Sequence, residues 1–191
     1  QPVIMKLSSV QKSDRVRKAA GGCFAYFYML PFCGSRNEAM TMNCTSLLEL
    51  LADGPVIAAV KDDAGLEAAL ESDVAVLFLL YGDILTIGEK VARIHQADKK
   101  AFVHLDLIDG LSAREISADF IARYTAADGV ISTKAALTKR ARELGLVAIQ
   151  RVFLLDSMAL KNVERHFSQE SADLVEVLPG LMPKIIRQLC Q

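Results

Sequence analysis

From residue 55 onward, short apolar runs alternate with amphipathic stretches along the chain. The runs are continuous and rich in Val, Ile and Leu, which is typical of parallel strands buried on both faces. They predict strands at 55–60, 74–80, 100–108, 129–133, 147–155 and 173–180. The stretches between them carry apolar residues at helical spacing. They predict helices near 84–96, 113–125, 135–144, 157–168 and 182–190, preceded by one that contains Leu66, Ala69 and Leu70.

This alternation predicts an α/β fold, with a parallel sheet covered by helices. Six β/α units fit either an open doubly wound sheet or part of a (β/α)8 barrel, which takes roughly 250 residues when complete. Periodicity does not separate these two arrangements. No GxGxxG motif follows the first strand, so the usual support for a dinucleotide-binding domain is missing.

Residues 1–39 do not share the alternation, and they are basic, with six basic and two acidic residues against 16 and 21 in residues 40–191. After Met40 and Met42, the segment 45–52 reads as a helix that stops at Gly54. We therefore expect an unassigned N-terminal extension over 1–39 and a regulatory domain over 40–191.

The chain carries few signs of metal, disulfide or membrane chemistry. Its four cysteines form no CxxC pair and lie near no histidine at zinc-ligand spacing, so we expect no metal site, no cofactor and no disulfide framework. The apolar run 22–33 falls short of the roughly 20 residues that a membrane span needs. The composition predicts a cytoplasmic protein without a membrane partner.

Polar residues gather where the predicted strands end, which is where ligands bind in parallel α/β folds. The candidate ligand-binding residues are Lys61, His104, Asp106, Ser132, Thr133, Lys134, Arg151 and Glu176. None of them forms a nucleophile elbow or a supported Ser/His/Asp constellation, so we assign no catalytic residue.

His104 and Asp106 are two residues apart, so on a strand their side chains share a face. An acid–base pair at the mouth of a barrel is one interpretation, since histidine titrates near neutrality. The alternative is a hydrogen-bonded core histidine beside an aspartate that caps the next helix.

Gln150 and Arg151 interrupt an apolar strand and face opposite sides of it. A charge inside a buried strand is costly unless it is paired, so Arg151 is expected to pair with Glu176 on the next strand, to bind a phosphate, or both. Ser132, Thr133 and Lys134 suit an anion at a helix N-terminus, although Ser and Thr also cap helices.

Three segments, 104–121, 128–157 and 175–186, closely resemble the glycerol uptake operon antiterminator regulatory proteins, and 55–85 resembles the first two β/α units of that family. IQRVFLLDS and EVLPG are its most specific motifs here. The resemblance implies a small TIM-type barrel that senses glycerol 3-phosphate in the bacterial cytoplasm. It also implies a regulator, and no enzyme, that binds the leader mRNA of glycerol-utilisation operons and promotes transcription antitermination.

The family continues with two further β/α units that this chain lacks. We therefore expect a TIM-barrel-like fold truncated to about six β/α units, with open edges on the first and sixth strands, association into homo-oligomers, and weak sensing. Two alternatives stay open: a phosphosugar lyase, isomerase or aldolase that uses His104 and Asp106, and an inactive fragment. The RNA-binding residues are not evident; one candidate patch is Lys134, Lys139, Arg140 and Arg142.

Overall fold

The computed structural model describes residues 3–6, 24–26, 28–31, 44–154 and 171–178. Six parallel strands follow one another in chain order, each hydrogen-bonded to the next. They are β4 (Val56–Val60), β5 (Val76–Leu79), β6 (Lys100–His104), β7 (Gly129–Ser132), β8 (Val147–Phe153) and β9 (Leu174–Leu178). The predicted α/β fold is therefore confirmed as a partial TIM-like barrel.

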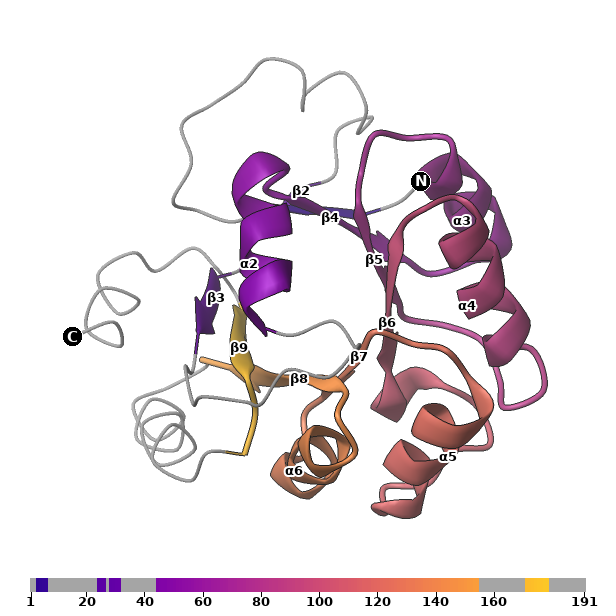
Figure 1. Ribbon diagram of the computed structural model, residues 1–191, viewed down its shortest axis with the longest axis vertical. Helices are drawn as coiled ribbons and strands as arrows, with labels where there is room; N and C mark the ends of the chain where they lie inside the picture. Colours follow the sequence, from indigo (N-terminus) through magenta and orange to yellow (C-terminus); the bar gives the residue numbers. More distant parts are fainter. Residues whose placement is uncertain (1–2, 7–23, 27, 32–43, 155–170, 179–191) are drawn as a thin grey trace.

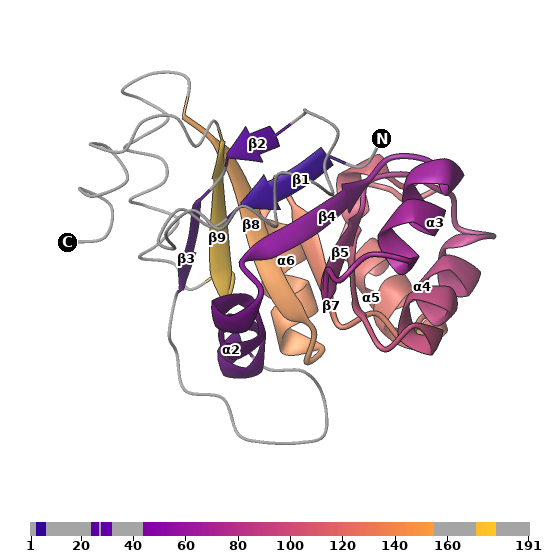
Figure 2. The ribbon, with the colours of Figure 1, turned by 90° about the horizontal axis from the view of Figure 1, so that it is seen from above.

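Four helices cover the outer face of the curved sheet (Figure 1). They are α3 (Asp63–Leu70), α4 (Ile87–Gln96), α5 (Ile116–Tyr124) and α6 (Ala135–Glu143). A fifth helix, α2 (Cys44–Asp53), packs against the inner face and lies toward one end of the sheet (Figure 2). The helices predicted at 157–168 and 182–190 lie outside the described residues.

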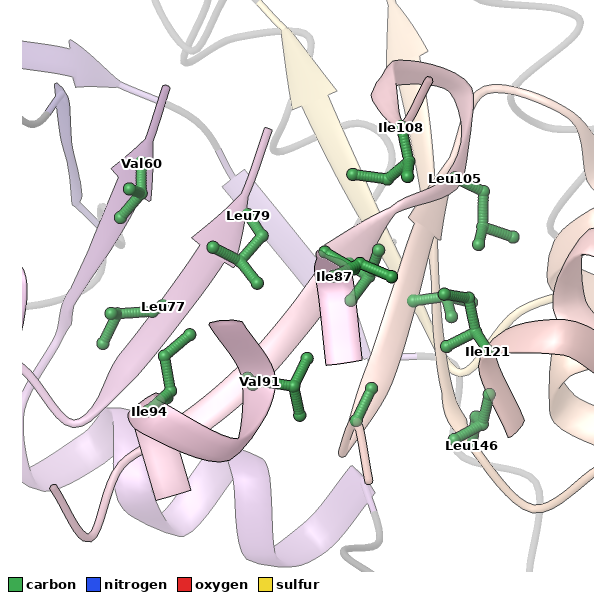
Figure 3. Packing of buried hydrophobic residues seen from close by; sticks show 14 of the residues in the cluster. Val60, Leu77, Leu79, Ile87, Val91, Ile94, Leu105, Ile108, Ile121 and Leu146 are labelled. Carbon is green, nitrogen blue, oxygen red and sulfur yellow. The ribbon is translucent and has the colours of Figure 1, made fainter. Parts of the chain in front are cut away.

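Alternating strand positions separate two apolar cores, because successive side chains point to opposite faces of a sheet. In the outer core, Val60, Leu77 and Leu79 of the strands pack with helix residues such as Val91 and Ile94 (Figure 3). The inner core contains Phe78 and Phe102, together with Leu47 and Leu51 of α2. Because both faces are covered, the strands are mostly apolar on both sides.

The third strand is shorter than its apolar pattern predicts. β6 ends at His104, and Leu105–Leu107 form a short 3-10 helix, η1. The chain then turns back at Gly110, which has a φ of 86°, a value that favours glycine. Asp106 therefore leaves the sheet and lies on a turn at its rim.

Strands from residues 1–39 pair with both ends of the six-stranded sheet. β1 (Val3–Lys6) is antiparallel to β4, and β3 (Tyr28–Pro31) is antiparallel to β9. β2 (Phe24–Tyr26) pairs with β1 in parallel, and a single residue of sequence separates it from β3. The two outermost strands of the nine-stranded sheet, β2 and β3, are therefore adjacent in the sequence.

The expectation of open edges on the first and sixth strands is thus wrong, because β1 and β3 satisfy the exposed backbone groups of β4 and β9. The sequence pattern missed these strands because they are short and lack the β/α alternation. The division of the chain at residue 40 stays a prediction.

Candidate ligand-binding site

Asp106 is the centre of a cluster of polar side chains at the carboxyl ends of β6 and β7. Ser132 Oγ donates to both carboxylate oxygens, at 3.0 and 3.1 Å. The backbone N–H and the hydroxyl of Thr133 donate to Oδ2 at 2.7 and 2.9 Å, and Lys134 Nζ lies 3.2 Å from Oδ1. The structure therefore brings together four of the predicted site residues.

The geometry follows from the two adjacent parallel strands. β6 and β7 pair up to His104 and Ile131, so the turns that follow them meet at the same edge of the sheet. Ser132 ends β7, and Lys134 is the N-cap of α6. The polar residues of the β7–α6 turn consequently face η1.

Asp106 is held as a carboxylate. Partial burial alone would raise its pKa, but the donors from Thr133, Lys134 and Ser132 outweigh burial and lower the pKa below the ordinary value. Asp106 does not cap the next helix, as one interpretation expected, because its partners belong to the turn before α6 and not to α5.

His104 lies beneath this cluster and is only 2% exposed. Its Nδ1 is 3.9 Å from Asp106 Oδ2, and it has no hydrogen-bond partner in the described part of the chain. Burial, followed by the nearby charge of Arg151, lowers the pKa of His104 to about 4. The imidazole is therefore neutral at pH 7.

The interpretation of His104 and Asp106 as an acid–base pair finds no support in this geometry, for two reasons. The ring does not reach hydrogen-bonding distance of the carboxylate, and the residue does not titrate near neutrality. The assumption that both residues share a strand face also fails, since only His104 belongs to β6.

The expected ion pair between Arg151 and Glu176 is confirmed. The two residues are register partners on β8 and β9, and Arg151 donates to both carboxylate oxygens. Both side chains are buried, at 7% and 0% exposure. Burial raises the pKa of Glu176, and the guanidinium opposes that shift.

Gln150 faces the opposite side of β8, where it accepts a hydrogen bond from Thr138 of α6 at 2.9 Å. Lys61, by contrast, is exposed at the end of β4 and makes no ion pair within the described ranges. The structure therefore does not bring Lys61 into the Asp106 cluster.

The candidate RNA patch on α6 is largely neutralised by carboxylates. Lys134 pairs with Asp106, and Arg140 binds Asp119 at 2.7 Å and Glu143 at 3.2 Å. Arg142 lies 3.0 Å from Asp173, an acidic residue just before β9 that the sequence analysis had not singled out. Of the four cations, Lys139 is exposed and has no carboxylate partner among the described residues.

Two features are absent from the described part of the chain. No group of three or more His, Cys, Asp or Glu side chains is placed to hold a metal ion there. Nor is any of the helices described both long and apolar enough to cross a membrane.

Comparison with known proteins places this chain in a family. Residues 56–191 match the family described as glycerol-3-phosphate responsive antiterminator. The "Uncharacterized protein YgcP" of Escherichia coli (strain K12) is 45% identical over 140 residues, an alignment that covers 73% of each protein.

Two crystal structures share the fold. The glycerol uptake operon antiterminator regulatory protein from Listeria monocytogenes has a TM-score of 0.66 and 27% identity, covering 69% of this chain and 71% of that one. A glycerol uptake operon antiterminator-related protein from Thermotoga maritima has a TM-score of 0.63 and 33% identity, covering 70% and 76%. The resemblance found in the sequence is confirmed: the chain belongs to the glycerol-3-phosphate responsive antiterminator family.

Proposed function

We propose that this protein is a cytoplasmic transcription antiterminator that binds the leader mRNA of glycerol-utilisation operons in response to glycerol 3-phosphate. The effector binds at the carboxyl ends of β6 to β9, where the candidate residues gather. Family membership supports the type of regulator, and the chemistry of the rim supports the type of ligand.

The observation that carries the proposal is the convergence of anion-binding groups at one edge of the sheet. Two hydroxyls, a backbone N–H before α6 and the ammonium of Lys134 all point at one acidic group. Such donors at the start of a helix suit a phosphate. The buried His104 lies directly below them and has hydrogen-bonding capacity to spare.

The competing enzyme hypothesis depended on His104 and Asp106 as an acid–base pair. Because His104 is neutral over the physiological range and makes no hydrogen bond to Asp106, that pair gives the hypothesis no support. A regulator requires only binding, which neutral imidazole and fixed donors provide.

A gel-shift titration of the leader RNA, with and without glycerol 3-phosphate, tests the proposal. We expect retention of the RNA to change when the effector is added, and to stay unchanged with glycerol, which lacks the phosphate. A scrambled RNA of equal length serves as the second control. Equal retention of leader and scrambled RNA under all conditions would contradict the proposal.

A further inference from the structure

The donors around Asp106 form a binding site for an oxyanion that is already occupied by a carboxylate from the same chain. Four donor groups from three consecutive residues, Ser132, Thr133 and Lys134, contact its two oxygens. Charge-assisted hydrogen bonds of this type are also those that hold phosphate. Asp106 therefore sits where an anionic ligand would be expected.

The carboxylate has no capacity left for a ligand. A carboxylate offers about four lone-pair sites, and the contacts with Ser132, Thr133 and Lys134 fill them. Asp106 consequently does not act as an acceptor for a hydroxyl group of the effector. Asp106 instead accepts the hydrogen bonds of the donors and neutralises the ammonium of Lys134.

A second observation, independent of the helix N-terminus, points to a ligand at this place. The ring of His104 has 3% of its side-chain surface exposed, and its Nδ1 is directed to within 3.9 Å of Asp106 Oδ2 without a hydrogen bond. A buried polar atom without a partner is costly and calls for an explanation. A phosphate oxygen, which reaches farther into the site than a carboxylate, supplies the missing partner.

We propose that Asp106 is an internal competitor that occupies the phosphate position of the unliganded protein, and that a phosphate monoester displaces it to bind Ser132, Thr133, Lys134 and His104. This inference rests on the proposed function, because it takes the same rim as the effector site. It adds a means of regulation: the ligand must release a carboxylate before it binds.

The displacement would be confined to η1. Before the turn, His104 is hydrogen-bonded into the sheet as the last residue of β6. After it, the backbone N–H of Asp109 donates to the carbonyl of Gly82, and the carbonyl of Asp109 accepts from the N–H of Ile84, with nitrogen–oxygen distances of 2.8 and 3.0 Å. Asp106 thus lies on a three-residue turn that is anchored on both sides, so that its side chain can leave the donors while Leu105 stays in the outer core.

Calorimetric titration with inorganic phosphate and with glycerol 3-phosphate tests the proposal on the full chain. Removing the internal carboxylate in Asp106→Ala should tighten binding of both by about tenfold, the value of one charge-assisted hydrogen bond. Asp109→Asn is the matched control, since it removes the same charge from an exposed residue of the same loop, and it should leave the affinity unchanged.

Two further variants make the result decisive. Asp106→Asn keeps the shape of the side chain and should show a smaller gain in affinity. It replaces Asp106→Ala in the test if that variant proves unstable. Adding Lys134→Met to Asp106→Ala should abolish the gain. Unchanged or weaker binding in both Asp106 variants, a gain that survives Lys134→Met, or no binding by any form would each overturn the proposal. Because no RNA is present, these results are separate from the leader-RNA test of the proposed function.

Discussion

Two carboxylates of the barrel, Asp106 after β6 and Glu176 on β9, are each paired with a cation, yet they differ in burial and in the elements that hold them. Glu176 is fully buried and bound by Arg151 from the adjacent strand, with the backbone ladder fixing both residues. Asp106 lies on a turn at the rim, and its partners Thr133 and Lys134 are exposed to solvent.

The difference separates an interaction that holds the sheet together from one that a ligand can replace. Water does not reach the Arg151–Glu176 pair, so the loss of either residue would leave the charge of the other buried and unpaired. Two of the donors to Asp106, the hydroxyl of Thr133 and the ammonium of Lys134, belong to exposed residues and can turn toward water or another anion at little cost. Only the rim cluster therefore has the properties of a switch.

The largest expected effect comes from breaking the buried pair. Glu176→Gln leaves the guanidinium of Arg151 uncompensated inside the sheet, and we expect the free energy of unfolding to fall by about 3–5 kcal/mol. Chemical denaturation followed by circular dichroism measures the loss. The double variant Arg151→Met with Glu176→Leu should recover most of the lost stability, because it removes both charges together. If stability is not recovered, the uncompensated charge of Arg151 is not the cause of the loss.

His104, which lies beside Asp106, makes the fold sensitive to acid. Its pKa is lowered to about 4 in the folded chain, from 6.5, so between these values the unfolded chain binds a proton that the folded one does not. Stability should therefore fall as the pH falls from 6.5 toward 4, by about 3 kcal/mol in total.

Denaturation midpoints measured across this pH range test the histidine effect. His104→Gln should flatten the profile between pH 6.5 and 4. His95→Gln, on α4, removes a histidine that is hydrogen-bonded to Asp128 and leaves His104 in place, so it serves as the comparison for the loss of any histidine. Equal slopes in the wild-type protein and His104→Gln would show that the burial of this ring does not control the acid response.

A smaller effect is expected at the rim. Asp106→Asn should lower the free energy of unfolding by about 1–2 kcal/mol, since its partners Thr133 and Lys134 are exposed and can be solvated. The pKa of Asp106 is lowered in the folded state, so its contribution is present above the ordinary pKa and is lost as the pH falls through the folded value. Thermal melts at pH 7 measure the loss; one as large as that of Glu176→Gln would remove the distinction between the two sites.

The parallel strands and the Arg151–Glu176 pair were predictable from the sequence because each depends on local pattern. Continuous apolar runs mark buried strands, and a lone arginine within one requires a carboxylate nearby. Because β8 and β9 are adjacent parallel strands, Arg151 and Glu176 then lie side by side as register partners.

The arrangement around Asp106 was not predictable in the same way. The sequence pattern HLDL reads as a continuation of β6, and nothing in it marks the change to a 3-10 turn at Leu105. Whether Asp106 faces α5 or α6 depends on that turn. The pairing of β1 and β3 with the sheet edges was missed for a related reason, since partners so distant in sequence leave no periodic signal.

The smallest effect is expected at a third carboxylate, Asp119 of α5, which binds Arg140 of α6 through two hydrogen bonds, at 2.7 and 3.2 Å. This pair resembles Arg151–Glu176 in geometry, but the side chain of Arg140 is 32% exposed, so water can solvate the guanidinium when its partner is lost. Asp119→Asn should therefore shift the denaturation midpoint less than either Asp106→Asn or Glu176→Gln, and high salt should reduce even that shift. A loss equal to that of Glu176→Gln would mean that bidentate geometry, and not burial, determines what these ion pairs contribute.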